Sequence, residues 1–180
     1  EERLHPVKLL KRTFALDPDK ELLQATLRMT AHGIYSAKIN GRKVTDALFT
    51  PDYTSYHSYL QVQEYEITGL LQERNVWSVA LADGWYGGRV RVNGGSGQFG
   101  DTLGILGEVT INYADGTTDT IGTDEQFVST TGKYVYSDIF IGEKQDLRLL
   151  ADDWETDFDC NGAEKVKIAD YSFDNLVPQK

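Results

Sequence analysis

Residues 75–93, NVWSVALADGWYGGRVRVN, are the stretch from which the fold is predicted. In its first half, seven of the eight residues from 76 to 83 are apolar or small, which is typical of a strand covered on both faces. The strand runs into Asp-Gly at positions 83–84, and WYGGR follows at 85–89. We therefore expect a buried strand that carries a contact loop of aromatic, glycine and arginine residues at its end.

The composition favours one globular domain over residues 1–180. At 180 residues and 40% hydrophobic content the chain is long enough to bury a core, and no linker divides it. The 18 basic and 28 acidic residues give a net charge of −10, which argues against nucleic acid and anionic membrane surfaces as partners. Ten Tyr and three Trp in such a chain favour a neutral sugar or a protein instead.

Cysteine content and the chain ends bear on where the protein acts. Cys160 is the one cysteine, so no intrachain disulfide forms, which favours the cytoplasm over a secreted location. No apolar run approaches the roughly 18 residues of a membrane span. The chain starts EERLHPVK and ends NLVPQK, without a signal peptide. We interpret it as a piece excised from a longer protein.

Strand-like alternation recurs along the whole chain. In residues 22–30 it places Leu23, Ala25, Leu27 and Met29 on one buried face. Asn-Gly at 40–41 and Asp-Gly at 115–116 are hairpin turns. Without a long helix, these features predict an antiparallel β-sandwich. The other expected elements are strands at 7–16, 34–39, 62–67, 105–113, 127–130, 134–136 and 165–172, a loop at 46–61, one helical turn at 68–71 and a mobile Gly-rich loop at 93–104.

Six groups of residues, taken in order and spacing, resemble the N-terminal domain of bacterial α-L-rhamnosidases. The resemblance covers roughly residues 8 to 178, and Asp-Gly-Trp-Tyr-x-Gly-Arg at 83–89 is its most specific part. Two places depart from the family pattern: Tyr53 stands where Trp is usual, and EKQDLR at 143–148 replaces Glu-x-Tyr-Asp-Ala-Arg. The six groups lie within residues 34–41, 51–56, 65–71, 83–89, 113–117 and 137–143.

The resemblance implies a jelly-roll β-sandwich of galactose-binding-domain type, placed ahead of an α/α-toroid catalytic domain. In that family the downstream domain carries the general acid and base and hydrolyses terminal α-L-rhamnose with inversion. The resemblance thus implies a non-catalytic accessory domain whose partner is the catalytic domain of the same chain. An independent module that binds rhamnose-containing glycans is the alternative, and an autonomous hydrolase is a third. Some related modules bind rhamnose with calcium, but their ligands do not align with this sequence.

The loop at 83–89 supplies the first candidate site: Asp83, Trp85, Tyr86 and Arg89. A sugar ring stacks its C–H face on an indole or phenol while charged groups bond its hydroxyls. The same residues also suit a structural role. Trp85 and Tyr86 then pack under the Gly-rich loop, and Arg89 pairs with Asp83 or Glu143.

Acidic residues supply the second set of candidates. Asp138 and Glu143 are either an acid/base pair, a docking point for the next domain, or partners of Arg148. Residues 153–164 place acids at calcium-loop spacing, but Phe158 replaces the required glycine; a solvated turn is the preferred interpretation, and no cofactor is expected. The three histidines, at positions 5, 32 and 57, are too scattered for a zinc site or a catalytic triad.

Overall fold

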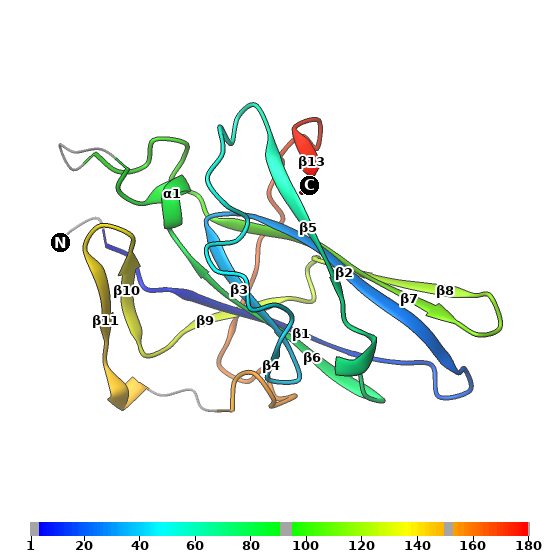
Figure 1. The fold of residues 1–180 in the computed structure, drawn as a ribbon. Coiled ribbons are helices and arrows are strands. Elements are labelled where there is room, and N and C mark those ends of the chain that lie inside the picture. The colour runs from blue at the N-terminus through cyan, green and yellow to red at the C-terminus, as the bar shows by residue number, and fades with distance from the viewer. Residues whose placement is uncertain (1–3, 91–94, 150–152, 180) are drawn as a thin grey trace.

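Two β-sheets pack face to face in the computed structural model, and a separate hairpin stands beside them (Figure 1). The structure describes residues 4–90, 95–149 and 153–179. The first sheet has the order β12 (Glu164–Lys165), β9 (Val128–Thr131), β1 (Lys8–Ala15), β6 (Arg74–Ala82), β3 (Ile34–Ile39), β4 (Arg42–Lys43). The second has the order β13 (Leu176–Pro178), β5 (Leu60–Glu66), β2 (Leu22–His32), β7 (Gly104–Tyr113), β8 (Thr118–Gly122).

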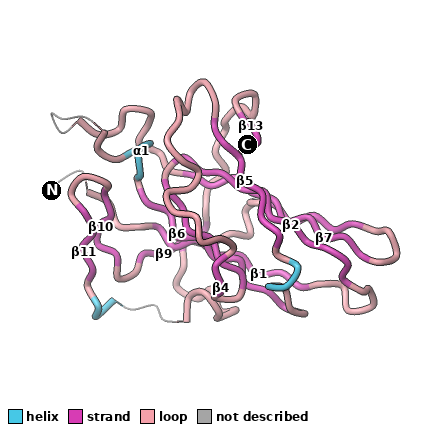
Figure 2. Tube along the Cα trace, viewed as in Figure 1, coloured by secondary structure: helices cyan, strands magenta, loops and turns pink. Residues whose placement is uncertain are grey.

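The remaining elements are short. The hairpin consists of β10 (Tyr134–Asp138) and β11 (Gly142–Gln145). In the described residues, helical structure is confined to single turns, as Figure 2 shows: α1 (Gly84–Gly87), η1 (Thr68–Leu70) and η2 (Leu147–Leu149). The predicted all-β sandwich is therefore confirmed. None of the helices in the described ranges is long and apolar enough to cross a membrane.

Strand β6 is the buried centre of the first sheet, as its sequence predicts. It pairs antiparallel with β1 on one side and β3 on the other. Trp77 on this strand is fully buried, and its ring meets Phe127 edge-on at 5.1 Å between centroids. From the second sheet, Leu27 and Val109 join the same core. Burial of both faces of β6 explains why its sequence lacks the usual apolar–polar alternation.

The Asn40-Gly41 hairpin is also confirmed. Both residues have positive φ, 53° and 76°, as a two-residue primed turn requires. The Asn40 side chain donates to the carbonyl of Leu70 and to Asn75 Oδ1, and its Oδ1 accepts from the N–H of Val76. One residue thus closes the hairpin and holds it against β6.

Two strand predictions are wrong in detail. Leu23 is 66% exposed, because a register shift between Leu22 and Gln24 against β7 removes it from the buried face. The strand expected at 165–172 is reduced to the pair Glu164–Lys165, and Ile168 lies exposed beyond it. The last strand, β13, comes later and runs parallel to β5, so the sandwich is not wholly antiparallel.

Candidate functional site

The turn after β6 presents the predicted aromatic residues at one end of the sandwich. Gly84 begins α1 with φ of 54°, and a Cβ there would lie 2.4 Å from the Ile34 side chain. Glycine is required at this point because both the conformation and the space exclude a side chain. The helical turn buries Tyr86 and leaves Trp85 half-buried.

Trp85 and Tyr86 belong to an aromatic cluster that also contains Phe49, Tyr53, Tyr56 and Phe99. Trp85 lies 5.7 Å from Phe49 and 5.8 Å from Tyr53 between ring centroids. These are tilted and edge-on contacts, the geometry that aromatic pairs prefer. Phe49 and Tyr53 are exposed, so with Trp85 they form what we call the outer aromatic surface. The loop at 46–61 therefore completes the site that begins at 83–89.

The Gly-rich loop covers the inner half of this cluster. Gly97 donates its N–H to the carbonyl of Gly87, and Phe99 donates to the carbonyl of Tyr86. A Cβ on Gly100 would come within 2.3 Å of the Tyr86 hydroxyl oxygen, so the loop passes directly over the phenol. Tyr86 thus packs under the loop, as the structural alternative expected. The predicted mobility of the Gly-rich loop falls partly on residues 93 and 94, which lie outside the described residues.

Histidines that are far apart in sequence approach this end of the sandwich. The His32 ring stacks on Tyr86 at 4.4 Å and 5°, and Tyr171 meets it edge-on. Burial, and then the nearby His57, lower the pKa of His32. His5 instead lies beside Asp83, with Nδ1 3.4 Å from Oδ2. Among the described residues, no three or more His, Cys, Asp or Glu side chains are grouped to hold a metal ion. Their sequence spacing gave no signal of this approach.

Asp83 is buried at the start of the turn, and its environment predicts a pH dependence. Burial raises its pKa, the His5 ring opposes this, and the Asp138 carboxylate adds to it. Since the folded protein holds the proton more tightly, the stability from protonated Asp83 is full below the ordinary pKa of about 3.9 and is lost as pH rises through the raised value. We expect Asp83→Asn to remove this loss in urea titrations across acidic pH.

Asp115→Asn is the matched control for that titration. The Asp115 carboxylate accepts hydrogen bonds from Thr117, which lower its pKa. Its stabilisation is present above the unfolded pKa and is lost as pH falls, so the substitution should act with the opposite sign. An Asp83→Asn protein whose stability follows the wild-type pH profile contradicts the argument.

The structure assigns Asp138 to the cap of the β10–β11 turn. Its Oδ1 accepts from the N–H groups of Phe140 and Ile141 at 2.9 and 3.0 Å. Its Oδ2 accepts from the backbone N–H of Arg89 at 3.3 Å. Asp138 is almost completely buried, whereas Glu143 lies exposed on β11. The two carboxylates are therefore in different environments on one hairpin.

The expected ion pairs of the arginines are not formed. Within the described ranges, no carboxylate lies at salt-bridge distance from the Arg89 guanidinium; Asp83 pairs with His5 instead. Arg148 pairs with Asp146 at 2.6 Å, not with Asp138 or Glu143. Arg89 thus contributes through its backbone, because Asp138 is within reach of its N–H. The sugar-contact and docking roles of these residues remain predictions.

The acidic segment from 153 is held by a lysine. The Lys11 ammonium donates to the carbonyls of Asp157 and Asp159 at 2.9 and 2.5 Å, and it lies 4.2 Å from the Trp154 ring centroid. Lys38 pairs with Glu155 at 2.5 Å. A side-chain cation therefore lies against the segment whose spacing suggested calcium. That no cofactor is needed remains a prediction.

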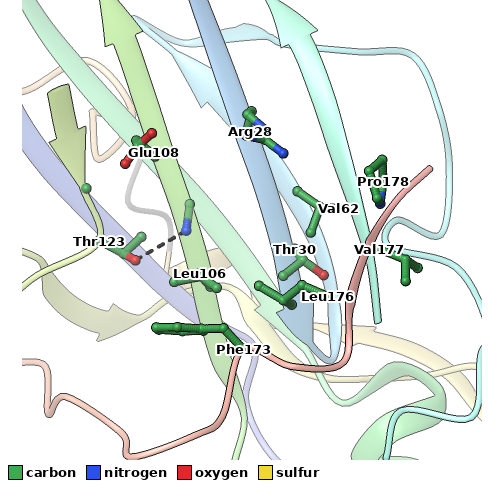
Figure 3. A pocket seen from close by; sticks show the side chains of 12 residues that line it. Arg28, Thr30, Val62, Leu106, Glu108, Thr123, Phe173, Leu176, Val177 and Pro178 are labelled. Carbon is green, nitrogen blue, oxygen red and sulfur yellow. Dashed lines mark hydrogen bonds between the residues drawn. The ribbon is translucent and has the colours of Figure 1, made fainter. Parts of the chain in front are cut away.

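A groove of about 490 Å³ lies on the second sheet (Figure 3). Phe173 and the β13 strand form one wall, and Arg28 and Glu108, opposite each other on β2 and β7, lie across from it. Arg28 also lies 3.6 Å from Glu64. None of the predicted site residues lines the groove. Sequence reasoning missed it because its walls come from four strands and the C-terminal segment.

The fold and the aromatic cluster define an all-β sandwich domain with an aromatic-rich loop end. Residues 20–180 match the α-L-rhamnosidase N-terminal domain family, and the chain belongs to that family. It is 32% identical over 173 residues to an α-L-rhamnosidase of Streptomyces avermitilis, covering 95% of this chain and 16% of that protein. The chain thus spans about a sixth of the length of this curated relative.

Solved structures agree with this assignment. The native α-L-rhamnosidase of Aspergillus terreus superposes with a TM-score of 0.92 and 30% identity, over 98% of this chain and 20% of that one. The Streptomyces avermitilis α-L-rhamnosidase complexed with L-rhamnose gives 0.87 and 32%, over 97% of this chain and 17% of that one. The resemblance drawn from the sequence is confirmed.

Proposed function

We propose that the chain is a non-catalytic accessory domain of an α-L-rhamnosidase and that it supports the catalytic domain of that enzyme. The observation that carries the proposal is its relation to much longer rhamnosidases, of which it matches 16–20%. The parent protein hydrolyses terminal α-L-rhamnose from glycosides. Its catalytic carboxylates then lie on polypeptide outside these 180 residues.

The geometry of the acidic candidates supports a non-catalytic role. Inverting glycosidases place two carboxyl groups about 6.5–9.5 Å apart on opposite sides of the sugar. Asp138 uses both oxygens to accept backbone N–H groups, and Glu143 lies exposed on β11 rather than in an enclosed site. In the groove of Figure 3, the residue opposite Glu108 on the neighbouring strand is Arg28 rather than a second acid.

A second candidate function is sugar binding, which the outer aromatic surface favours. Phe49 contacts Trp85 at a tilted angle and Tyr53 contacts it edge-on, and both Phe49 and Tyr53 are exposed. Solvent-accessible aromatic rings offer the apolar surface on which a pyranose ring stacks. The domain then acts as a carbohydrate-binding module for rhamnose-containing glycans. Tyr53 provides an aromatic ring where the family usually has Trp, so the apolar contact is retained.

Two assays on the 180-residue chain test these functions. We expect p-nitrophenyl α-L-rhamnoside to be hydrolysed no faster than in buffer, because the proposal places the catalytic carboxylates outside these 180 residues. Turnover by the chain alone overturns the accessory role. Calorimetry with L-rhamnose, with and without calcium, tests sugar binding. Saturable heat that Trp85→Ala abolishes and Phe173→Ala retains supports a carbohydrate-binding module at the outer aromatic surface. If no heat is measured with or without calcium, sugar binding is excluded and only the role of supporting the catalytic domain remains.

A further inference from the structure

The tip of the β10–β11 hairpin exposes three consecutive apolar side chains. Ile139, Phe140 and Ile141 are 37%, 62% and 40% exposed. The hairpin is its own two-stranded sheet and stands outside the sandwich, as Figure 1 shows. Single exposed apolar residues are common on protein surfaces, but a contiguous group marks an interaction site. We therefore expect this solvent-facing apolar group to bind a partner.

The backbone of the tip is fixed before any partner arrives. Asp138 accepts the N–H groups of Phe140 and Ile141, and Gly142 closes the turn with φ of 95°. Through Arg89, the same carboxylate holds the turn against the segment after α1. A surface ordered in advance loses little conformational entropy on binding. The tip is thus a rigid apolar knob rather than a loose loop.

The side chains around the knob match the rim of an interface. Glu143, Lys144 and Gln145 on β11 are all exposed and polar. Protein interfaces combine an apolar centre with a polar rim. Charged side chains on this strand also discourage edge-to-edge pairing with another sheet. Binding is therefore expected through the tip rather than through strand addition.

The small area of the knob indicates what kind of partner can bind it. Separate proteins need about 800 Å² from each partner for a stable complex, whereas fully covered aromatic side chains bury about 150–250 Å² each. Three side chains that are already partly covered fall well short of that area. A tethered partner needs much less, because a linker converts binding into an intramolecular step at roughly millimolar effective concentration. The knob therefore suits a partner on the same chain.

We infer that Ile139, Phe140 and Ile141 insert into an apolar recess of the remaining α-L-rhamnosidase polypeptide and anchor this domain to it. The inference rests on the proposed accessory role, which supplies the tethered partner. It assigns to Asp138 the role of a positioning residue, which holds the knob in shape from beneath.

Thiol labelling of Phe140→Cys in a Cys160→Ser background tests the inference. The variant is made both in the 180-residue chain and in the full gene product that carries it. Labelling by a maleimide is expected to be fast in the short chain and at least about tenfold slower in the long one, because opening the contact costs free energy. Leu23→Cys, at 66% exposure on β2, is the matched control and should label at similar rates in both.

The outcomes separate the inference from the proposed function. Equal labelling of Phe140→Cys in both proteins, with the long protein active on p-nitrophenyl rhamnoside, overturns the docking knob and leaves the accessory role in place. A long protein without rhamnosidase activity overturns the accessory role itself. Dimerisation of the short chain that Phe140→Ser abolishes in sedimentation experiments identifies a second copy as the occupant and also overturns the inference.

Discussion

Replacement of Trp77 by alanine is expected to lower the free energy of unfolding by about 3–5 kcal/mol, as large-to-small changes of core aromatics do. Trp77 is fully buried between the sheets and contacts Phe127 edge-on. The space around its ring is closed: a Cβ added at Gly107 would lie 3.1 Å from two of its ring carbons. Such a tightly enclosed site collapses poorly after truncation, so most of the cavity cost remains.

Urea denaturation, monitored by circular dichroism, measures this loss of stability. Trp85→Ala is the control. Trp85 is the same residue type on the same stretch of chain but is half-buried at the loop end, so a loss of about 1 kcal/mol is expected there. Equal losses for the two variants mean that β6 is not the organising centre of the core. A Trp77→Ala protein with near-wild-type stability leads to the same conclusion.

Local sequence signals sufficed for most of the sandwich. The apolar run that becomes β6 and the Asn40-Gly41 turn each depend on residues that are neighbours in sequence, so period and turn chemistry were enough to place them. Alternation within one strand does not reveal how that strand is paired with its neighbour. Leu23 obeys the period within β2, but the shift against β7 is a property of two strands together.

The pairing of the C-terminal strands also could not be predicted from their own residues. The predicted strand at 165–172 has a reasonable alternation, yet only its start finds a partner, β9. β13 is short and contains Pro178, which suits an edge position. Its parallel pairing with β5 depends on where the chain returns across the molecule. Residue types at these positions carry no information about that path.

The candidate site divides in a similar way. Trp85 and Tyr86 were identified because glycines and aromatics cluster after a strand, and the structure places both in one aromatic cluster. For Phe49 and Tyr53 the sequence predicts only an irregular loop, because nothing in their spacing says which element they contact. The sequence allows Asp138 to be an acid, a docking point or a partner of Arg148, whereas its hydrogen bonds make it a turn cap. The local signal is the position of Asp138 two residues before Phe140, because an Asp side chain often accepts a hydrogen bond from the backbone N–H two residues later.

Lys11→Met is expected to lower the free energy of unfolding by about 1.5–3 kcal/mol, the value of hydrogen bonds to charged groups. Lys11 is buried at 1% exposure, and its ammonium binds the carbonyls of Asp157 and Asp159 beneath the Trp154 ring. Methionine keeps the apolar stem but leaves those carbonyls unpaired. The segment at 153–159 should therefore loosen more than the sandwich itself.

Limited proteolysis of residues 153–159, together with urea denaturation, reports on both effects. Lys8→Met is the control, because Lys8 lies on the same strand but is exposed. Faster cleavage within the segment is expected for Lys11→Met and not for Lys8→Met. Because a side-chain cation already lies against this segment, calcium should change neither the cleavage rate nor the Tm of the wild-type chain. Cleavage of the wild-type segment that calcium suppresses contradicts this assignment, since the carbonyls then serve a metal ion rather than Lys11.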